Sequence, residues 1–207
     1  MTRVFSSALG GLLLLALTAC SERSLEWTED VKLPDGRIVR LTRYQEFRGV
    51  HEVGQRPTPS DYRLEFNNPD GGERVRWNGR RDLGTVALLM DEGAPELLMT
   101  PWLGGLRPWR CPDPPYLLFR YEAGQWKQIP LMTLRGQKIR PNMTNSPRDA
   151  GNDIRSHGNH LDWQLAGHVS DALEPIAYID FMNLTTQTFD ARCQPPFNTL
   201  EVKEGRR

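Results

Sequence analysis

The segment that holds most of the histidines gathers the side chains best suited to bind a metal ion. Three of the four histidines, His157, His160 and His168, lie within twelve residues, and aspartates flank them. Imidazole and carboxylate groups are good ligands for zinc and similar ions. Gly158 and Asn159, however, disfavour the helix that would place His157 and His160 on one face, and the His-Glu-x-x-His pattern is absent. The segment therefore indicates either a metal site or a solvated loop whose last histidine leads into a strand.

Motifs for covalent catalysis or phosphate binding are absent from the sequence. Ser156 precedes His157 and Ser170 follows His168 closely, but triads are recognised by spatial roles and not by sequence neighbours. The chain has no Gly-x-Ser-x-Gly elbow and no Gly-rich phosphate cradle of either common type. We therefore expect no catalytic residue and no cofactor, and we favour a protein that is not an enzyme. A metal-dependent enzyme that uses the three histidines is the alternative.

The stretch PWLGGLRPWRCPDPP combines aromatic and basic side chains with turn residues. It contains Trp102, Arg107, Trp109, Arg110 and Cys111. Tryptophan and arginine are enriched at the centres of binding interfaces, and a disulfide in this loop would reduce the entropy lost on binding. The same rings could instead cover one end of a β-sheet core, with the cysteine fastening the loop. Both interpretations, a binding surface and a structural cap, are open.

The first nineteen residues have the three parts of an export signal. Arg3 supplies the positive charge, and the apolar run Ala8–Leu17 follows. This run is too short to span a bilayer comfortably, because a spanning helix needs roughly 20 apolar residues. The tetrapeptide Leu17-Thr18-Ala19-Cys20 resembles the lipobox of bacterial lipoproteins. An ordinary secretory signal followed by a chance cysteine is the alternative.

The resemblance implies that Cys20 carries diacylglycerol and becomes the first residue of the mature chain, residues 1–19 being removed. Two or three acyl chains anchor a protein stably where one would not. In this family Ser21, rather than aspartate, favours the outer membrane. Residues 20–24 would then form the tether, and its last four residues reach at most about 14 Å. We therefore expect a domain held close to a membrane and facing the periplasm.

Once Cys20 is assigned to lipid, Cys111 and Cys193 remain. Exported chains meet an oxidising compartment, so we expect these two residues to form a disulfide. The bridge would close a loop of about 82 residues, which is worth roughly 4–5 kcal/mol in the chain-entropy model. Two free thiols are the alternative.

Composition narrows the class of partner. The chain has 26 basic and 26 acidic residues, so its formal net charge is zero. Nucleic-acid binding depends on a basic excess that neutralises phosphates, so we expect no nucleic-acid partner. The length fits one domain over residues 25–207, and we expect a monomer.

Period-two alternation of apolar and polar residues predicts a mainly β fold. LEWTEDVKL, for example, places Leu25, Trp27, Val31 and Leu33 on one face, and Asp35-Gly36 after it is a strong hairpin signal. We expect a single antiparallel β domain, as a sandwich, a barrel or a curled meander, with long loops (141–160 above all) and at most short helices. The strand-like segments are LEWTEDVKL, RIVRLTRYQEF, DYRLEF, ERVRWNG, TVALLM, ELLMT, YLLFRYE, QWKQIPL, LDWQLAG, IAYIDF and NTLEVK.

The phrases VKLPDGRIV and LLFRYEAGQWKQIPL resemble segments of uncharacterised exported bacterial proteins. The resemblance covers about a fifth of the chain and implies no activity. Together with the lipobox it predicts a membrane-anchored envelope protein of binding or scaffolding type, with an envelope protein as a possible partner. A small-ligand carrier built on a β barrel or cleft is a further alternative.

Overall fold

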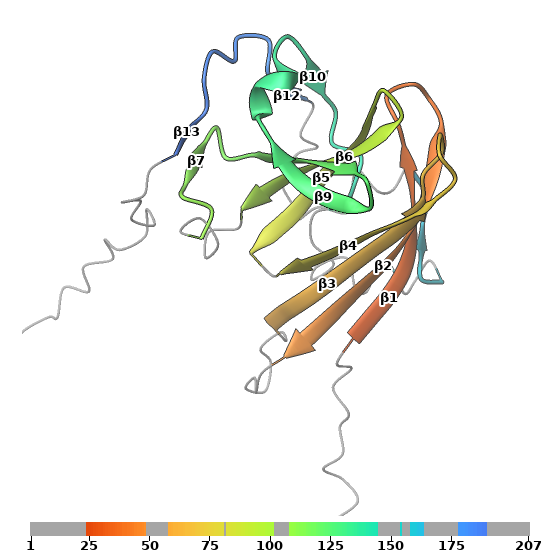
Figure 1. Cartoon of the computed structure of the whole chain (residues 1–207). Coiled ribbons are helices and arrows are strands. Elements are labelled where there is room, and N and C mark those ends of the chain that lie inside the picture. Colours follow the sequence, from red (N-terminus) through yellow and green to blue (C-terminus); the bar gives the residue numbers. More distant parts are fainter. Residues whose placement is uncertain are drawn as a thin grey trace, which may run out of the picture.

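A computed structural model describes residues 24–48, 58–80, 82–101, 108–144, 154, 158–163 and 178–189. Two antiparallel-dominated sheets pack face to face over a shared core (Figure 1). One has five strands in the order β11-β1-β2-β3-β4, and the other has four in the order β5-β6-β8-β9. The sheets are not closed into a barrel. The predicted mainly β fold is therefore confirmed, and among its three predicted forms the sandwich fits.

The strands are short to medium in length, and four hairpins provide most of the sheet pairing. The β1–β2, β3–β4, β5–β6 and β8–β9 hairpins each join two of the predicted strand-like segments, and the hairpin predicted at Asp35-Gly36 is confirmed. The strands are β1 Ser24–Lys32, β2 Ile38–Arg48, β3 Thr58–Asn67, β4 Arg74–Arg80, β5 Leu83–Asp91, β6 Ala94–Pro101, β7 Pro112–Asp113, β8 Leu117–Glu122, β9 Gln125–Ile129, β10 Lys138–Ile139, β11 His160–Leu161, β12 Ile179–Asp180 and β13 Thr188–Phe189, with a 3-10 helix at Leu131–Leu134.

The core between the sheets is built from alternate residues of each strand, as period-two patterning requires. The five-stranded sheet buries its apolar side chains on this inner face, whereas its outer face carries charged and polar side chains, among which Glu65 is buried. Buried residues of this core are Val31, Leu33, Val39, Leu41, Tyr62, Leu64, Phe66, Val75, Trp77, Leu83, Leu88, Leu97, Met99, Leu117, Phe119 and Met143.

In the four-stranded sheet, β5, β6 and the first half of β8 are buried on both faces, whereas the edge strand β9 has no buried residue. The second face of the sheet packs against the 3-10 helix and the short strands β10 and β12. A strand that is covered on both faces has a continuous run of apolar residues in its sequence. This explains why β5 carries Val86, Ala87, Leu88 and Leu89 in succession, all of them buried. The strand-like segments TVALLM and ELLMT thus lie in the central layer of the molecule.

Both open sides of the sandwich are closed by side chains. On one side Trp126 of β9 donates its indole N–H to the carbonyl oxygen of Arg76 on β4 at 2.8 Å, and its ring meets Trp77 edge-on at 5.4 Å. On the other side Asn142 donates to the carbonyl oxygens of Lys32 on β1 and Leu88 on β5, each at 3.0 Å. The two sheets are therefore joined across both edges.

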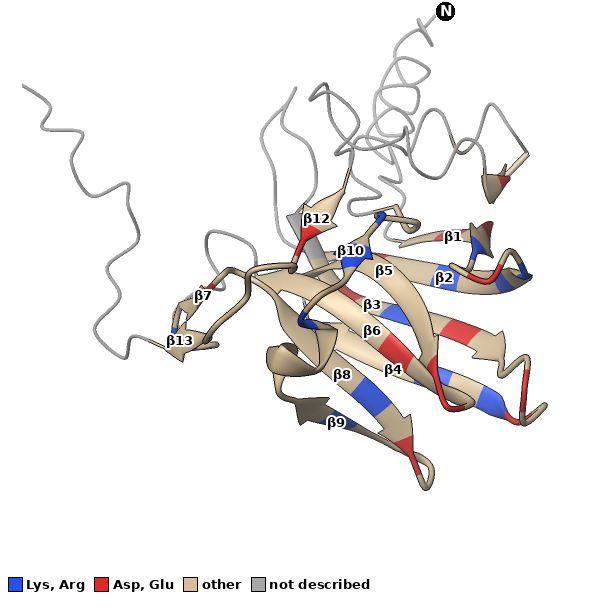
Figure 2. Ribbon diagram, turned by 90° about the horizontal axis from the view of Figure 1, so that it is seen from above, with Lys and Arg blue, Asp and Glu red and all other residues tan. Residues whose placement is uncertain are grey.

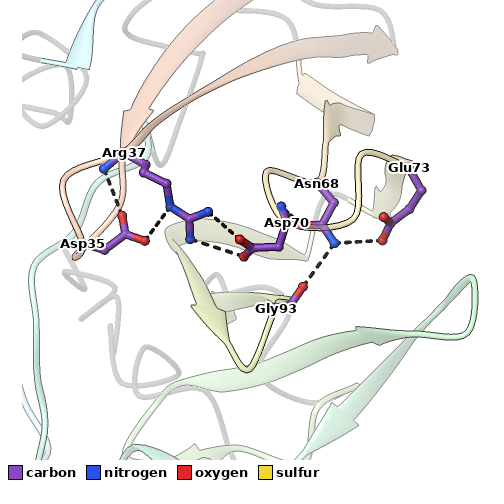
Figure 3. Close-up of polar contacts among 6 residues, drawn as sticks. All are labelled: Asp35, Arg37, Asn68, Asp70, Glu73 and Gly93. Atoms are coloured by element: carbon purple, nitrogen blue, oxygen red, sulfur yellow. Dashed lines mark hydrogen bonds and ion pairs between the residues drawn. The ribbon is translucent and has the colours of Figure 1, made fainter.

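Strand direction places all four hairpin turns at one end of the sandwich and Ser24 at the other (Figure 1). We call residues 34–37, 68–73, 92–93 and 123–124 the turn end. Its turns are bonded to one another (Figure 3): Arg37 donates to Asp35 and to Asp70, each at 2.6 Å. Asn68 donates to Glu73 at 2.9 Å and to the carbonyl oxygen of Gly93 at 3.2 Å. Three hairpins of both sheets are locked together here.

Candidate functional site

Trp109, one of the predicted binding residues, lies against the core. Its indole N–H donates to Asp82 at 3.1 Å, and its ring meets Phe119 edge-on at 5.9 Å. These contacts favour the structural cap over the binding surface for this residue. Arg110 is exposed, with its guanidinium 5.9 Å from the Phe189 ring. Trp102 and Arg107 lie outside the described residues, so the grouping of the four stays a prediction.

The predicted covalent sites are only partly within the structure's described part. Cys111 lies just before β7 and is half-buried, with a backbone φ of 44°. Cys193, its predicted disulfide partner, and Cys20, the predicted lipid attachment point, both fall outside the ranges given above. The disulfide and the lipid anchor stay predictions.

Of the three predicted metal ligands, His160 alone is described, and it belongs to the sheet. It lies on β11, which pairs in parallel with β1. Its Nδ1 lies 2.8 Å from Oγ1 of Thr28 and its Nε2 lies 3.5 Å from a carboxylate oxygen of Asp30. Within the described ranges there is no group of three or more His, Cys, Asp or Glu side chains that could hold a metal ion. His157 and His168 fall outside those ranges, so a metal site is neither supported nor tested.

The sandwich interior contains an ion pair. The side chains of Glu29 and Arg43 are 0% and 3% exposed, and their Oε2 and Nη1 atoms lie 2.7 Å apart. Arg43 also donates to Oγ1 of Thr85 at 2.9 Å and to the carbonyl oxygen of Thr144 at 2.7 Å. The other Glu29 oxygen accepts the backbone N–H of Thr144 at 2.5 Å. The pair therefore joins β1, β2, β5 and the chain at Thr144.

Sequence reasoning missed this pair, although the strand pattern contained the signal. In β1, Glu29 falls between Trp27 and Val31 on the inward register, and in β2 Arg43 follows Leu41 on the inward register. A charge at an inward position needs a partner, because an isolated buried ion is very costly. The guanidinium also lies 5.0 Å from the Trp27 ring. Because both side chains are buried and bound to each other and to the chain at Thr144, we assign the pair a structural role.

A second interior polar contact is equally structural. Trp77 donates its indole N–H to the Tyr62 hydroxyl at 3.1 Å. Burial raises the pKa of Tyr62 well above its ordinary value, so the phenol stays protonated at neutral pH. Gly79 permits the close approach of the Tyr62 ring, since a Cβ atom there would lie 2.3 Å from two of its carbons.

The outer face of the five-stranded sheet carries a concentrated basic group. Arg63 of β3 and Arg74 and Arg76 of β4 all contact the carboxylate of Glu65. We call these three residues the arginine cluster. The Nε atoms of Arg63 and Arg76 lie 3.2 Å and 2.6 Å from one Glu65 oxygen, while Arg74 binds the other.

The Glu65 carboxyl is shielded from solvent by these arginines, its side chain being only 8% exposed. Burial by itself raises the pKa of this group, but the hydrogen bond from Arg74 and the three positive charges outweigh it and hold the pKa below the ordinary value of 4.5. The group is therefore ionised at neutral pH. No sequence motif identifies the arginine cluster and its carboxylate. The members come from two strands, and the alternation of apolar and polar residues predicts only that each of them faces outward.

Comparison with models of known protein families, with curated proteins and with solved structures finds no match. Among the residues described, no helix is long and apolar enough to cross a membrane. The sites above therefore have to be interpreted from their own chemistry.

Proposed function

We propose that this chain is a bacterial lipoprotein, anchored through Cys20 and facing the periplasm, whose β-sandwich is a binding or scaffolding domain of the cell envelope. The observation that carries the proposal is the position of β1. It begins at Ser24, directly after the short tether that follows the lipobox, and it pairs with β2 from its first residue, Ser24 opposite Glu46. The folded domain would thus start within about 14 Å of the lipidated residue.

This arrangement supports a defined orientation. The nine residues of β1 run from the Ser24 end to the turn end, a span of about 26 Å at roughly 3.3 Å per residue. The turn end, with its hairpins bonded by Arg37 and Asn68, would be the part of the domain farthest from the membrane. A rigid end raised above a lipid surface suits a protein that positions or holds a partner.

A binding role is better supported than catalysis. The titratable groups in the described interior are engaged with protein partners: Glu29 with Arg43, Glu96 with Arg120, and Tyr62 with Trp77. His160 lies against Thr28. The carrier alternative would need an apolar cavity, whereas the inward faces of the two sheets pack into one core. Ser21 after the predicted lipidated cysteine supports the outer membrane as the location.

The test is mass spectrometry of the N-terminal peptide of the full-length protein, extracted from its native membrane with mild detergent. We expect a peptide that begins at Cys20 with the mass of attached acyl chains. Cys20→Ala should abolish both processing and acylation, and Cys111→Ala should leave them intact. A peptide that begins elsewhere, or an unmodified Cys20, would contradict the proposal.

The same extract tests the binding role. Quantitative mass spectrometry of proteins that co-purify with the wild type, compared with the Cys20→Ala chain, should reveal a stoichiometric partner that depends on anchoring. A correctly acylated protein without any partner above background would leave the anchor in place and contradict the scaffolding role.

A further inference from the structure

The arginine cluster brings three like charges together on an exposed surface. The side chains of Arg63, Arg74 and Arg76 are 42%, 69% and 53% exposed, whereas the Glu65 carboxylate beneath them is 8% exposed. One negative charge therefore faces three positive ones, which leaves a local excess of two. In a chain whose acidic and basic residues balance at 26 each, this excess is a local concentration of charge.

Most hydrogen-bond donors of the arginine cluster remain available. A guanidinium carries about five N–H donors and a carboxylate offers about four lone-pair sites, so one carboxylate can use only a minority of the donors. Glu65 is nearly buried, whereas the side chains of the three arginines are 42% to 69% exposed, so donors that Glu65 does not bind are accessible to solvent. Guanidinium groups match the planar, bidentate geometry of phosphate and carboxylate oxygens.

The positions directly opposite the arginine cluster are uncharged, and the charged residues around them are paired. Outward positions next to it in the register are Thr42 opposite Glu65, and Tyr44 and Asn78 opposite Arg63. The neighbouring Arg40 is bound in bidentate fashion by Asp30. Apart from Glu65, these flanking positions thus offer hydroxyl and amide groups. The nearest further carboxylate on β3, that of Asp61, lies 3.3 Å from the guanidinium of Arg48 and is paired with it. Figure 2 shows basic positions on both β3 and β4.

Protection of a sheet edge explains only part of this arrangement. Charged side chains on an edge strand prevent pairing with other chains, and β4 is the edge of its sheet. Arg63, however, lies on β3, an internal strand. Its guanidinium stacks 5.0 Å from the Tyr44 ring and turns toward the same carboxylate as the two arginines of β4. Edge protection does not require this third, converging arginine.

We propose that the arginine cluster is a binding site for a phosphate group, carried by a lipid headgroup or by a soluble molecule. Glu65 holds the guanidiniums in place when the site is empty, and the phosphate engages the donors that Glu65 leaves free. The site does not depend on lipid attachment at Cys20, since it lies wholly within β3 and β4. It would add a ligand to a domain for which the proposed function names only a protein partner.

The experiment is residue-resolved labelling of arginines with phenylglyoxal on the full-length protein in a non-ionic detergent. Inorganic phosphate should slow the modification of Arg63, Arg74 and Arg76 several-fold, as read by mass spectrometry. The exposed Arg135, far from the arginine cluster in sequence, is the internal control and should react at the same rate throughout. Protection should weaken at high salt, because exposed charges are screened within about 10 Å at 0.1 M.

Two variants separate binding from a structural effect. Arg74→Gln combined with Arg76→Gln should remove the protection of Arg63 by phosphate. The control, Lys127→Gln combined with Lys138→Gln, changes the net charge equally at exposed positions on other strands and should leave the protection intact. Glu65→Gln removes the competing carboxylate and should lower the phosphate concentration needed for half protection several-fold. If the arginine cluster only stabilises the fold, Glu65→Gln would leave the phosphate concentration for half protection unchanged.

A second arm identifies the source of the phosphate. The protein is reconstituted in vesicles of phosphatidylcholine alone or with added phosphatidylglycerol. Protection that appears with the anionic lipid indicates a headgroup, and protection by inorganic phosphate without a lipid effect indicates a soluble ligand. Absence of protection in both arms, in the wild type and in Glu65→Gln, would overturn the proposal. Lipidation at Cys20 is measured separately, so failure of the anchor and failure of this site are distinguishable.

Discussion

At the scale of single residues, Arg43 supplies the positive charge that neutralises the buried Glu29 carboxylate. Arg43→Met would leave the Glu29 carboxylate buried without its cation, and breaking a buried pair from one side costs about 3–5 kcal/mol. The double variant Glu29→Leu, Arg43→Met removes both charges and should be less destabilised than the sum of the two single variants. Urea unfolding of all four chains, with a constant m-value, measures this coupling. Additive costs would show that the two side chains do not act as a pair.

Glu65 gives stability a dependence on pH. Its folded-state pKa lies below the ordinary 4.5, so its ion pairs stabilise the fold above that value and are lost as the pH falls through the folded pKa. The difference in unfolding free energy between wild type and Glu65→Gln should therefore be constant near neutral pH and shrink in acid. Urea midpoints of both chains across this range provide the measurement. Arg74→Gln with Arg76→Gln should flatten the dependence; an unchanged profile would contradict the assignment.

At the scale of elements, Asn142 acts as a piece of strand at the free edge of β5. Its side chain accepts the N–H of Leu88 at 2.9 Å and donates to the carbonyl oxygens of Leu88 and Lys32. Asn142→Ala leaves the part-buried N–H and carbonyl oxygen of Leu88 without these bonds, at a cost of about 1–3 kcal/mol, whereas the exposed Lys32 carbonyl oxygen can bind water instead. Hydrogen exchange of the Leu88 amide should accelerate in the variant. Exchange that stays at the wild-type rate would mean that Asn142 is not the cover of this edge.

The hairpins were predictable because their turns and their alternation are local properties. Asp35-Gly36 sets a tight turn whose second residue has a φ of 90°, and the apolar residues on either side follow the same period. Glu29 and Arg43 could not be assigned to a pair, since the inward register identifies each as unusual but not its partner on the neighbouring strand. The role of Asn142 could not be predicted for the same reason. Its partners on β1 and β5 lie 110 and 54 residues away, and no local pattern encodes such contacts.

Of the predicted strand in LDWQLAG, only the first three residues are described, and one of them is in a strand. Leu161 belongs to the two-residue strand β11, whereas Asp162 and Trp163 are not in a strand. Trp163 instead places its ring 4.2 Å from the Lys32 ammonium group. An alternating segment forms a long strand only where a neighbouring strand offers a long edge for pairing. β11 pairs with β1 at just two residues of β1, Thr28 and Glu29. Tertiary context thus decided the extent of this element.

At the scale of the whole molecule, the two ends of the sandwich differ in their relation to the predicted anchor. Ser24 opens β1 at one end, next to Glu46 and therefore near Arg48. Gln125 lies at the other end, where β9 leaves the β8–β9 turn. If Cys20 carries lipid, the four residues that follow it allow the Ser24 end to rise at most about 14 Å from the headgroups. Gln125 should then stand farther from the lipid surface than Arg48 by an amount comparable to the length of β1, about 26 Å.

This geometry is measurable by energy transfer to acceptors in the bilayer surface. Arg48→Cys and Gln125→Cys, each labelled with a donor in the reconstituted full-length protein, should be quenched to clearly different extents, with the label at position 48 quenched more. The chain without an added cysteine, treated identically, corrects for any labelling of its own cysteines. Insertion of a long glycine-serine segment after Ser21 should reduce quenching at position 48 most, because it releases the end that the short tether holds down. Equal quenching at both positions before the insertion would mean that the sandwich lies on its side, with its outer sheet face and the arginine cluster at the lipid surface or turned away from it.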